Sequence, residues 1–174
     1  MKIEPLKTKI DPVKCVGNWY VQVAVPTPLD SGASNGLEQY SWDAEKERVS
    51  VVYDFDTPKG KKMTVQQIGG VTDKEFGTTW WVKPKIGFFY LPFKLPYLVI
   101  DVDTENYQWL TASSPKTTGV APWLYIMTRD QVVTDEYLAP RIALAEKAGW
   151  DMAKSERLPQ GVPVVPGTPA SEGK

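Results

Sequence analysis

The chain has 174 residues, of which 42% are hydrophobic and 24% are charged, a composition typical of one globular domain. The formal net charge of -1 gives no sign of a basic surface for nucleic acid. The sequence contains no histidine and one cysteine, Cys15, which excludes histidine-based catalytic triads, histidine zinc sites and an internal disulfide.

The N-terminal residues carry charges and prolines and lack the apolar segment of a secretory signal. No run approaches the roughly 20 apolar residues of a membrane-spanning helix. We therefore expect a soluble protein that is either cytoplasmic or the mature form of a processed precursor. We predict no cofactor, no metal site and no nucleic-acid partner.

Eight β-strands are predicted after an extended N-terminal arm at 1–15. The strands are rich in Val, Tyr and Trp, and the turns between them contain Pro, Gly, Asp and Asn. The predicted strands are 19–25, 37–42, 49–55, 63–71, 78–83, 97–102, 107–113 and 122–128. Their regular spacing indicates an antiparallel meander, and closing the meander into a barrel removes the exposed sheet edges.

A helix is predicted after the last strand, because the hydrophobic period changes there. Leu138, Ile142 and Ala145 fall on one helical face. Thr134 is suited to cap the start of this helix and Gly149 to end it. We expect a domain of barrel plus helix at 16–158, followed by a disordered tail rich in Pro and Gly at 159–174.

Three motifs, in order along the chain, resemble those of the lipocalin family. Gly17-Asn18-Trp19-Tyr20 is similar to its Gly-X-Trp motif. The turn from Asp103 to Tyr107 is similar to its second motif, with one extra residue, and "LYIMTRD", which contains Arg129, resembles its third. Together with the helix, "AGWD" and the tail, they look most like the bacterial and plant temperature-induced, apolipoprotein D-like lipocalins. The resemblance implies an all-β, eight-stranded up-and-down barrel with one C-terminal helix outside.

The resemblance also implies structural roles at the closed end of the barrel. Trp19 should fill this end, Arg129 should lie across its indole, and Gly17 should let the arm pass close by. A guanidinium stacked on an indole contributes about 0.5–2 kcal/mol. Gly17, Trp19, Tyr107 and Arg129 are therefore predicted to be structural residues and not ligand contacts.

The loop at 84–96 should lie at the open mouth of the barrel and is unusually apolar. Phe88, Phe89, Tyr90 and Phe93 would not be expected in a loop that only faces water. A lid over the mouth is the preferred interpretation, and docking to a membrane or to a partner is the alternative.

Strand alternation and the resemblance together predict the inward-facing residues. Trp80 and Trp81 cannot both point inward, because neighbouring side chains alternate, and Trp81 is chosen. On the next strand either Tyr97 with Val99 or Leu98 with Ile100 faces inward, and the resemblance favours the first pair. The predicted ligand-binding residues are Tyr40, Val51, Tyr53, Phe55, Met63, Gln67, Trp81, Tyr97, Val99, Trp109, Trp123, Tyr125 and Met127. The alternative is that these side chains simply fill a closed core.

The resemblance implies a binding protein that carries or sequesters a small hydrophobic molecule, such as a fatty acid, lysolipid, retinoid or other isoprenoid. It also implies a role in transport or in a stress response. One alternative is an isomerase or de-epoxidase acting on lipids, for which Cys15 is badly placed and Asp101 is the candidate carboxylate. Another is a protein with a filled barrel that docks to a membrane or partner. The sequence leaves the ligand and the oligomeric state open.

Overall fold

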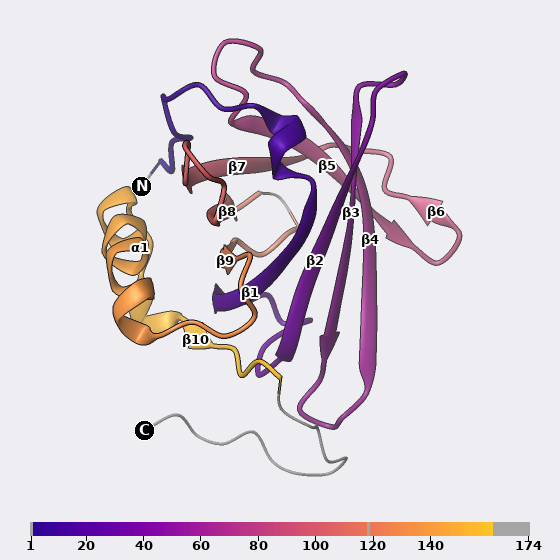
Figure 1. Ribbon diagram of the computed structural model, residues 1–174. Helices are drawn as coiled ribbons and strands as arrows, with labels where there is room; N and C mark the ends of the chain where they lie inside the picture. The colour runs from indigo at the N-terminus through magenta and orange to yellow at the C-terminus, as the bar shows by residue number, and fades with distance from the viewer. Residues whose placement is uncertain (1, 118, 162–174) are drawn as a thin grey trace.

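The computed structural model describes residues 2–117 and 119–161, which form a closed antiparallel β-barrel with one α-helix on its outside (Figure 1). The barrel strands are β1 (Gly17–Val25), β2 (Ser34–Asp43), β3 (Arg48–Asp56), β4 (Lys62–Val71), β5 (Thr79–Ile86), β7 (Leu95–Val102), β8 (Trp109–Ser114) and β9 (Trp123–Thr128). Each strand pairs with the next, and β9 pairs back with β1. The predicted eight-stranded up-and-down barrel is therefore confirmed.

The α-helix α1 (Asp135–Ala148) begins and ends where the sequence predicts. The Thr134 side chain accepts a hydrogen bond from the Tyr137 N–H at 3.2 Å, and Gly149 adopts φ 108°, a left-handed conformation that suits glycine. Leu138 and Ala145 are buried against the outer surface of the barrel. The cluster that they join contains Leu98 and Ile100 of β7 and Leu124 and Ile126 of β9.

The C-terminal segment forms part of the barrel wall. β10 (Glu156–Arg157), which follows the short 3-10 helix η2 (Met152–Lys154), pairs with β1. Beyond it, the Gln160 side-chain amide donates to the carbonyl of Val21 at 2.7 Å and to that of Gly36 at 2.9 Å. These carbonyls belong to β1 and β2, so Gln160 bridges the two strands. Leu158 is buried in the interior cluster beside them. The packed structure thus continues to Gln160, inside the tail predicted at 159–174, and the part of that tail from 162 onward lies outside the described residues.

The N-terminal arm covers the closed end and leads through the 3-10 helix η1 (Pro12–Cys15) into β1. The Ile10 N–H donates to the Phe76 carbonyl at 2.8 Å, and the Thr78 hydroxyl donates to the Leu6 carbonyl at 2.7 Å. The arm is therefore held to the β4–β5 turn and the start of β5. In the described part of the chain, no helix is both long and apolar enough to cross a membrane.

Candidate functional site

The closed end of the barrel contains the predicted pair of Trp19 and Arg129. Trp19 is fully buried, and the Arg129 guanidinium carbon lies 3.6 Å from the centre of its ring. The indole N–H donates to the Cys15 carbonyl at 2.8 Å. The prediction that Arg129 covers Trp19 is confirmed, and the stack separates the interior from solvent at this end.

Arg129 also ties separate segments together through their backbone carbonyls. It donates to the carbonyl oxygens of Lys14, Val16, Asn18 and Tyr107 at 2.9–3.1 Å. A Cβ atom at Gly17 would meet the Arg129 Nη1 atom at 3.0 Å, so only glycine leaves the guanidinium its full space. The Tyr107 hydroxyl, in turn, accepts from the Asp11 N–H at 2.9 Å.

The barrel interior is lined by a chain of aromatic rings that touch one another. Ring centres of neighbours along this chain lie 4.8–6.3 Å apart, in stacked, tilted and edge-on arrangements. The chain runs Tyr40, Trp80, Tyr97, Trp123, Tyr125, Tyr53 and Phe55. In this conformation an entering ligand must therefore part the rings or replace contacts between them.

Most of the predicted ligand-binding residues lie in or against the interior cluster. Val51, Tyr53 and Phe55 of β3 point inward together, as their alternation predicts. Their partners on β4 are Gln67, Val65 and Met63, of which the last two pack against the cluster. The other predicted residues found in or against the cluster are Tyr40, Tyr97, Val99, Trp123, Tyr125 and Met127. The choice of Tyr97 and Val99 over Leu98 and Ile100 is thus correct, because the latter pair lies under the helix.

The prediction that Trp81 faces inward is wrong. Trp80 is the buried residue of the two, and its ring stacks on Tyr97 at 5.3 Å. The half-buried Trp81 lies on the outer surface, where the Lys94 ammonium is 4.4 Å from its ring centre. Adjacent aromatic residues have equal hydrophobicity, so only the register of β5 with β7 decides between them.

Trp109 is also misplaced by the sequence analysis. Leu110, not Trp109, pairs with inward-facing Met127. Trp109 lies outside the barrel, under Arg141 of α1, whose guanidinium carbon is 3.8 Å from its ring centre. The inward-facing residues of this strand are therefore Leu110 and, two residues after it, the small Ala112.

Asp101 is likewise outside the barrel. The register of β7 against β8 shifts between Val99 and Asp101, so that one extra residue reverses the alternation. Asp101 therefore pairs with Thr111 and lies beside Trp109 and Arg141, where partial burial raises the pKa of its carboxyl. It does not reach a ligand inside the barrel.

Glu38 is a buried carboxyl inside the barrel that the sequence analysis missed. The Tyr40 hydroxyl donates to it at 2.5 Å, and the Tyr40 and Tyr97 hydroxyls share a further short hydrogen bond. Burial raises the pKa of Glu38 to about 7, the Tyr40 hydrogen bond lowers it, and the negative charge of Asp30 raises it further. A signal was present, because Glu38 is two residues before Tyr40 on the same strand, so the two share a face, and Tyr40 was itself predicted to face inward.

Asp30 brings a second carboxyl to the interior, from the loop between β1 and β2. Its Oδ1 atom accepts hydrogen bonds from the Thr27 N–H at 2.9 Å and the Thr27 hydroxyl at 2.6 Å. Its Oδ2 atom accepts from Tyr125 at 2.6 Å and more weakly from Tyr53 at 3.4 Å. This loop, and not the predicted one at 84–96, therefore packs over the mouth. No strand pattern marks a loop residue of this kind.

Cys15 is fully buried at the closed end, against the indole of Trp19 and away from the mouth. Burial raises the pKa of its thiol to about 12, with Arg129 lowering it and Asp11 raising it to lesser extents. A thiol in this state is protonated at neutral pH and is a poor nucleophile.

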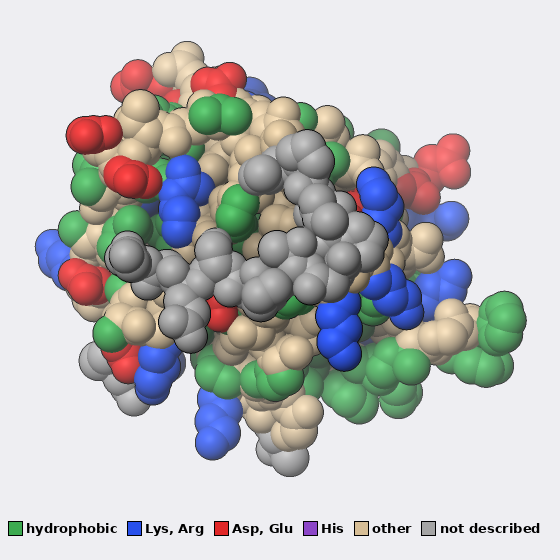
Figure 2. Space-filling view, turned by 90° about the horizontal axis from the view of Figure 1, so that it is seen from below, with side chains coloured by type: hydrophobic (Ala, Val, Ile, Leu, Met, Phe, Trp, Pro, Cys, Tyr) green, Lys and Arg blue, Asp and Glu red, His purple; other side chains and the backbone are tan. Residues whose placement is uncertain are grey.

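The apolar loop does not form a lid, and that preferred interpretation is wrong for this conformation. The end of β5 and β6 (Phe89–Tyr90) pair as a short hairpin that projects from the barrel on the side away from α1 (Figure 1). Phe88 is 93% exposed and Phe89 79%, and Ile86, Tyr90 and Phe93 are also exposed. Seen from below, hydrophobic side chains project at that edge of the molecule (Figure 2).

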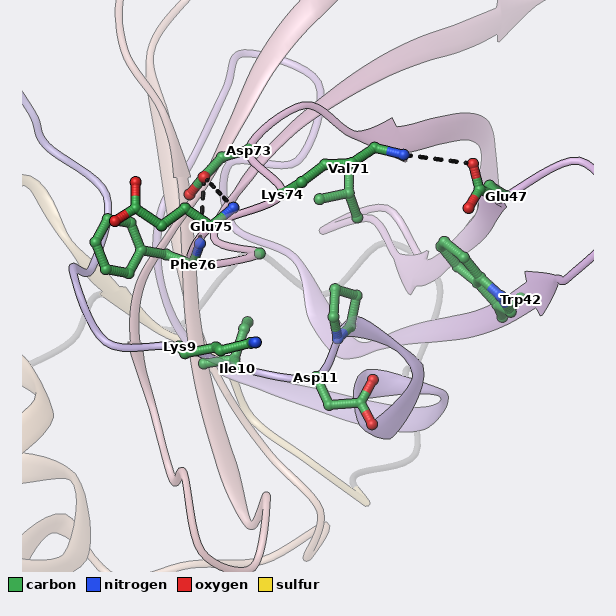
Figure 3. A pocket seen from close by; sticks show the side chains of 12 residues that line it. Lys9, Ile10, Asp11, Trp42, Glu47, Val71, Asp73, Lys74, Glu75 and Phe76 are labelled. Atoms are coloured by element: carbon green, nitrogen blue, oxygen red, sulfur yellow. Dashed lines mark hydrogen bonds and ion pairs between the residues drawn. The ribbon is translucent and has the colours of Figure 1, made fainter.

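A hollow of about 480 Å³ lies outside the barrel, between the N-terminal arm and two turns at the closed end (Figure 3). Among its charged groups, Lys74 pairs with Glu47 at 3.5 Å, and Asp73 accepts from the N–H groups of Glu75 and Phe76. It contains none of the predicted site residues. Within 2–117 and 119–161, no group of three or more Cys, Asp or Glu is placed to hold a metal ion.

The sequence model of a family described as a lipocalin-like domain matches residues 10–160. No match is found among curated protein sequences.

Similar solved structures show the same fold. Insecticyanin from the tobacco hornworm Manduca sexta has a TM-score of 0.73 at 12% identity, covering 94% of this chain and 87% of its own. Lobster apocrustacyanin A1 has a TM-score of 0.62 at 14% identity, covering 86% and 79%. The siderocalin Ex-FABP has a TM-score of 0.63 at 14% identity, covering 86% and 96%. With a closed eight-stranded barrel and a family match over most of its length, this chain belongs to the lipocalin family.

Proposed function

We propose that the protein binds a small, largely apolar molecule inside the barrel and carries or sequesters it. The observation that supports this proposal is the chain of interior rings, which offers broad apolar faces and several phenol groups in one place. Fatty acids, lysolipids, retinoids and other isoprenoids all have the apolar character that suits such a site. The half-buried Trp123, stacked on Tyr125 at 4.8 Å, is the ring whose face we expect an entering ligand to contact first.

A binding role is favoured over an enzymatic one by the positions of Cys15 and Asp101, the two residues considered for catalysis from the sequence. The Cys15 thiol is protonated and buried at the closed end, and Asp101 lies outside the barrel. We therefore assign no catalytic residue.

A series of straight-chain alcohols tests the proposal, because a neutral head group leaves charge out of the comparison. Each buried methylene contributes about 0.8 kcal/mol, so affinity should rise about fourfold per carbon until the interior is filled. Binding is followed by tryptophan fluorescence and by native mass spectrometry. Trp123→Ala should weaken binding several-fold, whereas Trp81→Ala, on the outer surface, serves as the matched control. If no alcohol binds below about 100 µM, equivalent to roughly 5.5 kcal/mol, the proposal is wrong.

The exposed hairpin supports a second proposed activity, contact with a membrane surface. Isolated apolar side chains are common on protein surfaces, but five exposed apolar or aromatic residues on one projecting hairpin are not. Between 77 and 100 the charged residues are Lys83, Lys85 and Lys94, with no acidic residue among them. Lysines around aromatic side chains are the combination that suits an anionic lipid surface.

Co-sedimentation with lipid vesicles tests this second proposal. We expect the protein to bind phosphatidylcholine vesicles that contain phosphatidylserine, and to bind less at high salt. Phe88→Ser with Phe89→Ser should abolish binding. Leu29→Ser with Val132→Ser also removes two exposed apolar residues, but from elsewhere on the surface, and should not affect binding. Equal loss in both double variants, or no binding by the parent protein, would rule out the hairpin as a membrane contact.

A further inference from the structure

Two carboxyl groups inside the barrel determine what kind of polar group can enter it. Asp30 and Glu38 are 3% and 1% exposed, respectively, and each accepts a hydrogen bond from an interior tyrosine. They come from different elements, the β1–β2 loop and β2, and they meet the same chain of rings. The mouth and the middle of the interior thus each contain one acidic group.

The hydrogen-bond donors around these carboxyls are already used. Tyr125 and Tyr53 donate to Asp30, and Tyr40 donates its one proton to Glu38. Tyr97 must then be the donor in its contact with Tyr40. Each of these four phenol groups already donates its one proton in a hydrogen bond, whereas lone pairs remain on the carboxylate and phenol oxygens. The interior therefore offers acceptors to a ligand and no free phenol proton.

Within 2–117 and 119–161, no cation lies inside the barrel to balance these acidic groups. Among the residues that the structure describes, the buried charged ones are all Asp or Glu. Arg129 is the nearest candidate by position, but the indole of Trp19 separates it from the interior, and its donors are engaged by four carbonyls. A ligand carboxylate in this site would face like charges without a compensating partner.

We propose that the barrel selects apolar molecules whose polar end donates hydrogen bonds, with an amine preferred to an alcohol and a carboxylic acid disfavoured. This inference rests on the proposed function and names the ligand class of the same site. An ammonium group supplies three donors and a positive charge to Asp30 and Glu38, and an alcohol supplies one donor without charge. A carboxylate supplies only acceptors.

The test compares decylamine, decanol and decanoate, which share one chain length and differ in the head group. Titrations at about pH 8 keep Glu38 mainly ionised, because its pKa is about 7. We expect decylamine to bind at least tenfold more tightly than decanoate, a difference of about 1.4 kcal/mol, with decanol between them. Asp30→Asn and Glu38→Gln keep the side-chain shape and remove the charge. Each should lower the ratio of decylamine affinity to decanoate affinity several-fold, while the affinity for decanol changes little.

Asp101→Asn is the matched control, because it removes a partly buried acidic group from the outer surface of the barrel and should leave the ratio unchanged. Circular dichroism of each variant establishes that the barrel remains folded. If decanoate binds as tightly as decylamine while decanol still binds, the selectivity is refuted and the carrier function survives. If none of the three ligands binds, the carrier function fails, and the selectivity fails with it. If the ratio of decylamine to decanoate affinity falls as much in Asp101→Asn as in the Asp30 and Glu38 variants, the overall charge of the protein, and not these two interior carboxyls, determines which ligand binds better.

Discussion

Replacement of Arg129 by alanine should destabilise the barrel by about 3 kcal/mol. The stack on Trp19, at 3.6 Å, contributes about 1 kcal/mol. The four lost hydrogen bonds to backbone carbonyls contribute about 0.5 kcal/mol each, at the low end of the usual range because water reaches most of these carbonyls after the change. For a domain of this size, the loss corresponds to a fall in Tm of roughly 6–12 °C.

Arg141→Ala provides the matched control for this prediction. Arg141 stacks on Trp109 at 3.8 Å, almost as Arg129 stacks on Trp19, but it donates to a single carbonyl, that of Tyr137. Its loss should cost about 1.5 kcal/mol, since the stack is similar and three carbonyl bonds are missing. Urea denaturation followed by circular dichroism measures both changes without depending on tryptophan fluorescence. Lysine at 129 should restore only part of the loss, because an ammonium cannot stack as a plane or reach all four carbonyls.

If Arg129→Ala and Arg141→Ala lower the free energy of unfolding equally, the carbonyl bonds contribute nothing and only the stack matters. Affinity for a barrel ligand should be nearly unchanged in Arg129→Ala, because Trp19 still fills the closed end. A large loss of affinity with no loss of stability would place Arg129 in the binding site, contrary to the orientation described above.

Three further predictions concern the interior. Trp80→Ala should lower the free energy of unfolding by about 3–5 kcal/mol, and Trp81→Ala by about 1 kcal/mol or less, as measured by urea denaturation. The reverse order would contradict the register of β5 with β7. The folded-state pKa of Glu38, about 7, is raised above the ordinary 4.5, so its stabilising contribution is complete below pH 4.5 and is lost as the pH rises through 7. Between about pH 4.5 and 7, the free energy of unfolding of the parent protein should therefore fall by up to roughly 3 kcal/mol relative to that of Glu38→Gln. A difference in denaturation midpoint between the two proteins that stays constant with pH would exclude the effect. Leu158→Ala should cost about 3 kcal/mol, and Leu158→Met less than about 1.5 kcal/mol; calorimetry that finds the alanine variant unchanged would show that the C-terminal segment is not part of the core.

The fold was largely predictable because local signals agree with the final structure. Alternation on β3, the cap at Thr134 and the glycine at Gly149 each specify an element without reference to its neighbours. The contact between Trp19 and Arg129 spans 110 positions, and it was predicted only from the family motifs. No periodicity in the sequence connects these two residues.

The site was less predictable, because its details depend on register and on loops. The shift between Val99 and Asp101 reverses one strand's alternation, and nothing in the local sequence marks it. The carboxyl of Asp30 enters the interior because Thr27 and two tyrosines hold it there, which only the folded chain brings together. Glu38 was predictable because it shares a strand face with Tyr40 two residues later, but a charged residue on a strand is usually assigned to the solvent face. The projecting hairpin could be recognised as apolar, but not as exposed.

The position of Gln160 between β1 and β2 has a consequence for how the protein is made. Its hydrogen bonds to Val21 and Gly36 join residues that are 139 and 124 positions apart. During synthesis, β1 emerges from the ribosome before the other strands. Its partner β9 emerges about a hundred residues later, and Gln160, which bridges β1 and β2, emerges later still. The wall therefore cannot be completed until Gln160 has been released, and the apolar faces of the early hairpins stay uncovered until then. In this protein the last described residues complete the structure that the first strand begins.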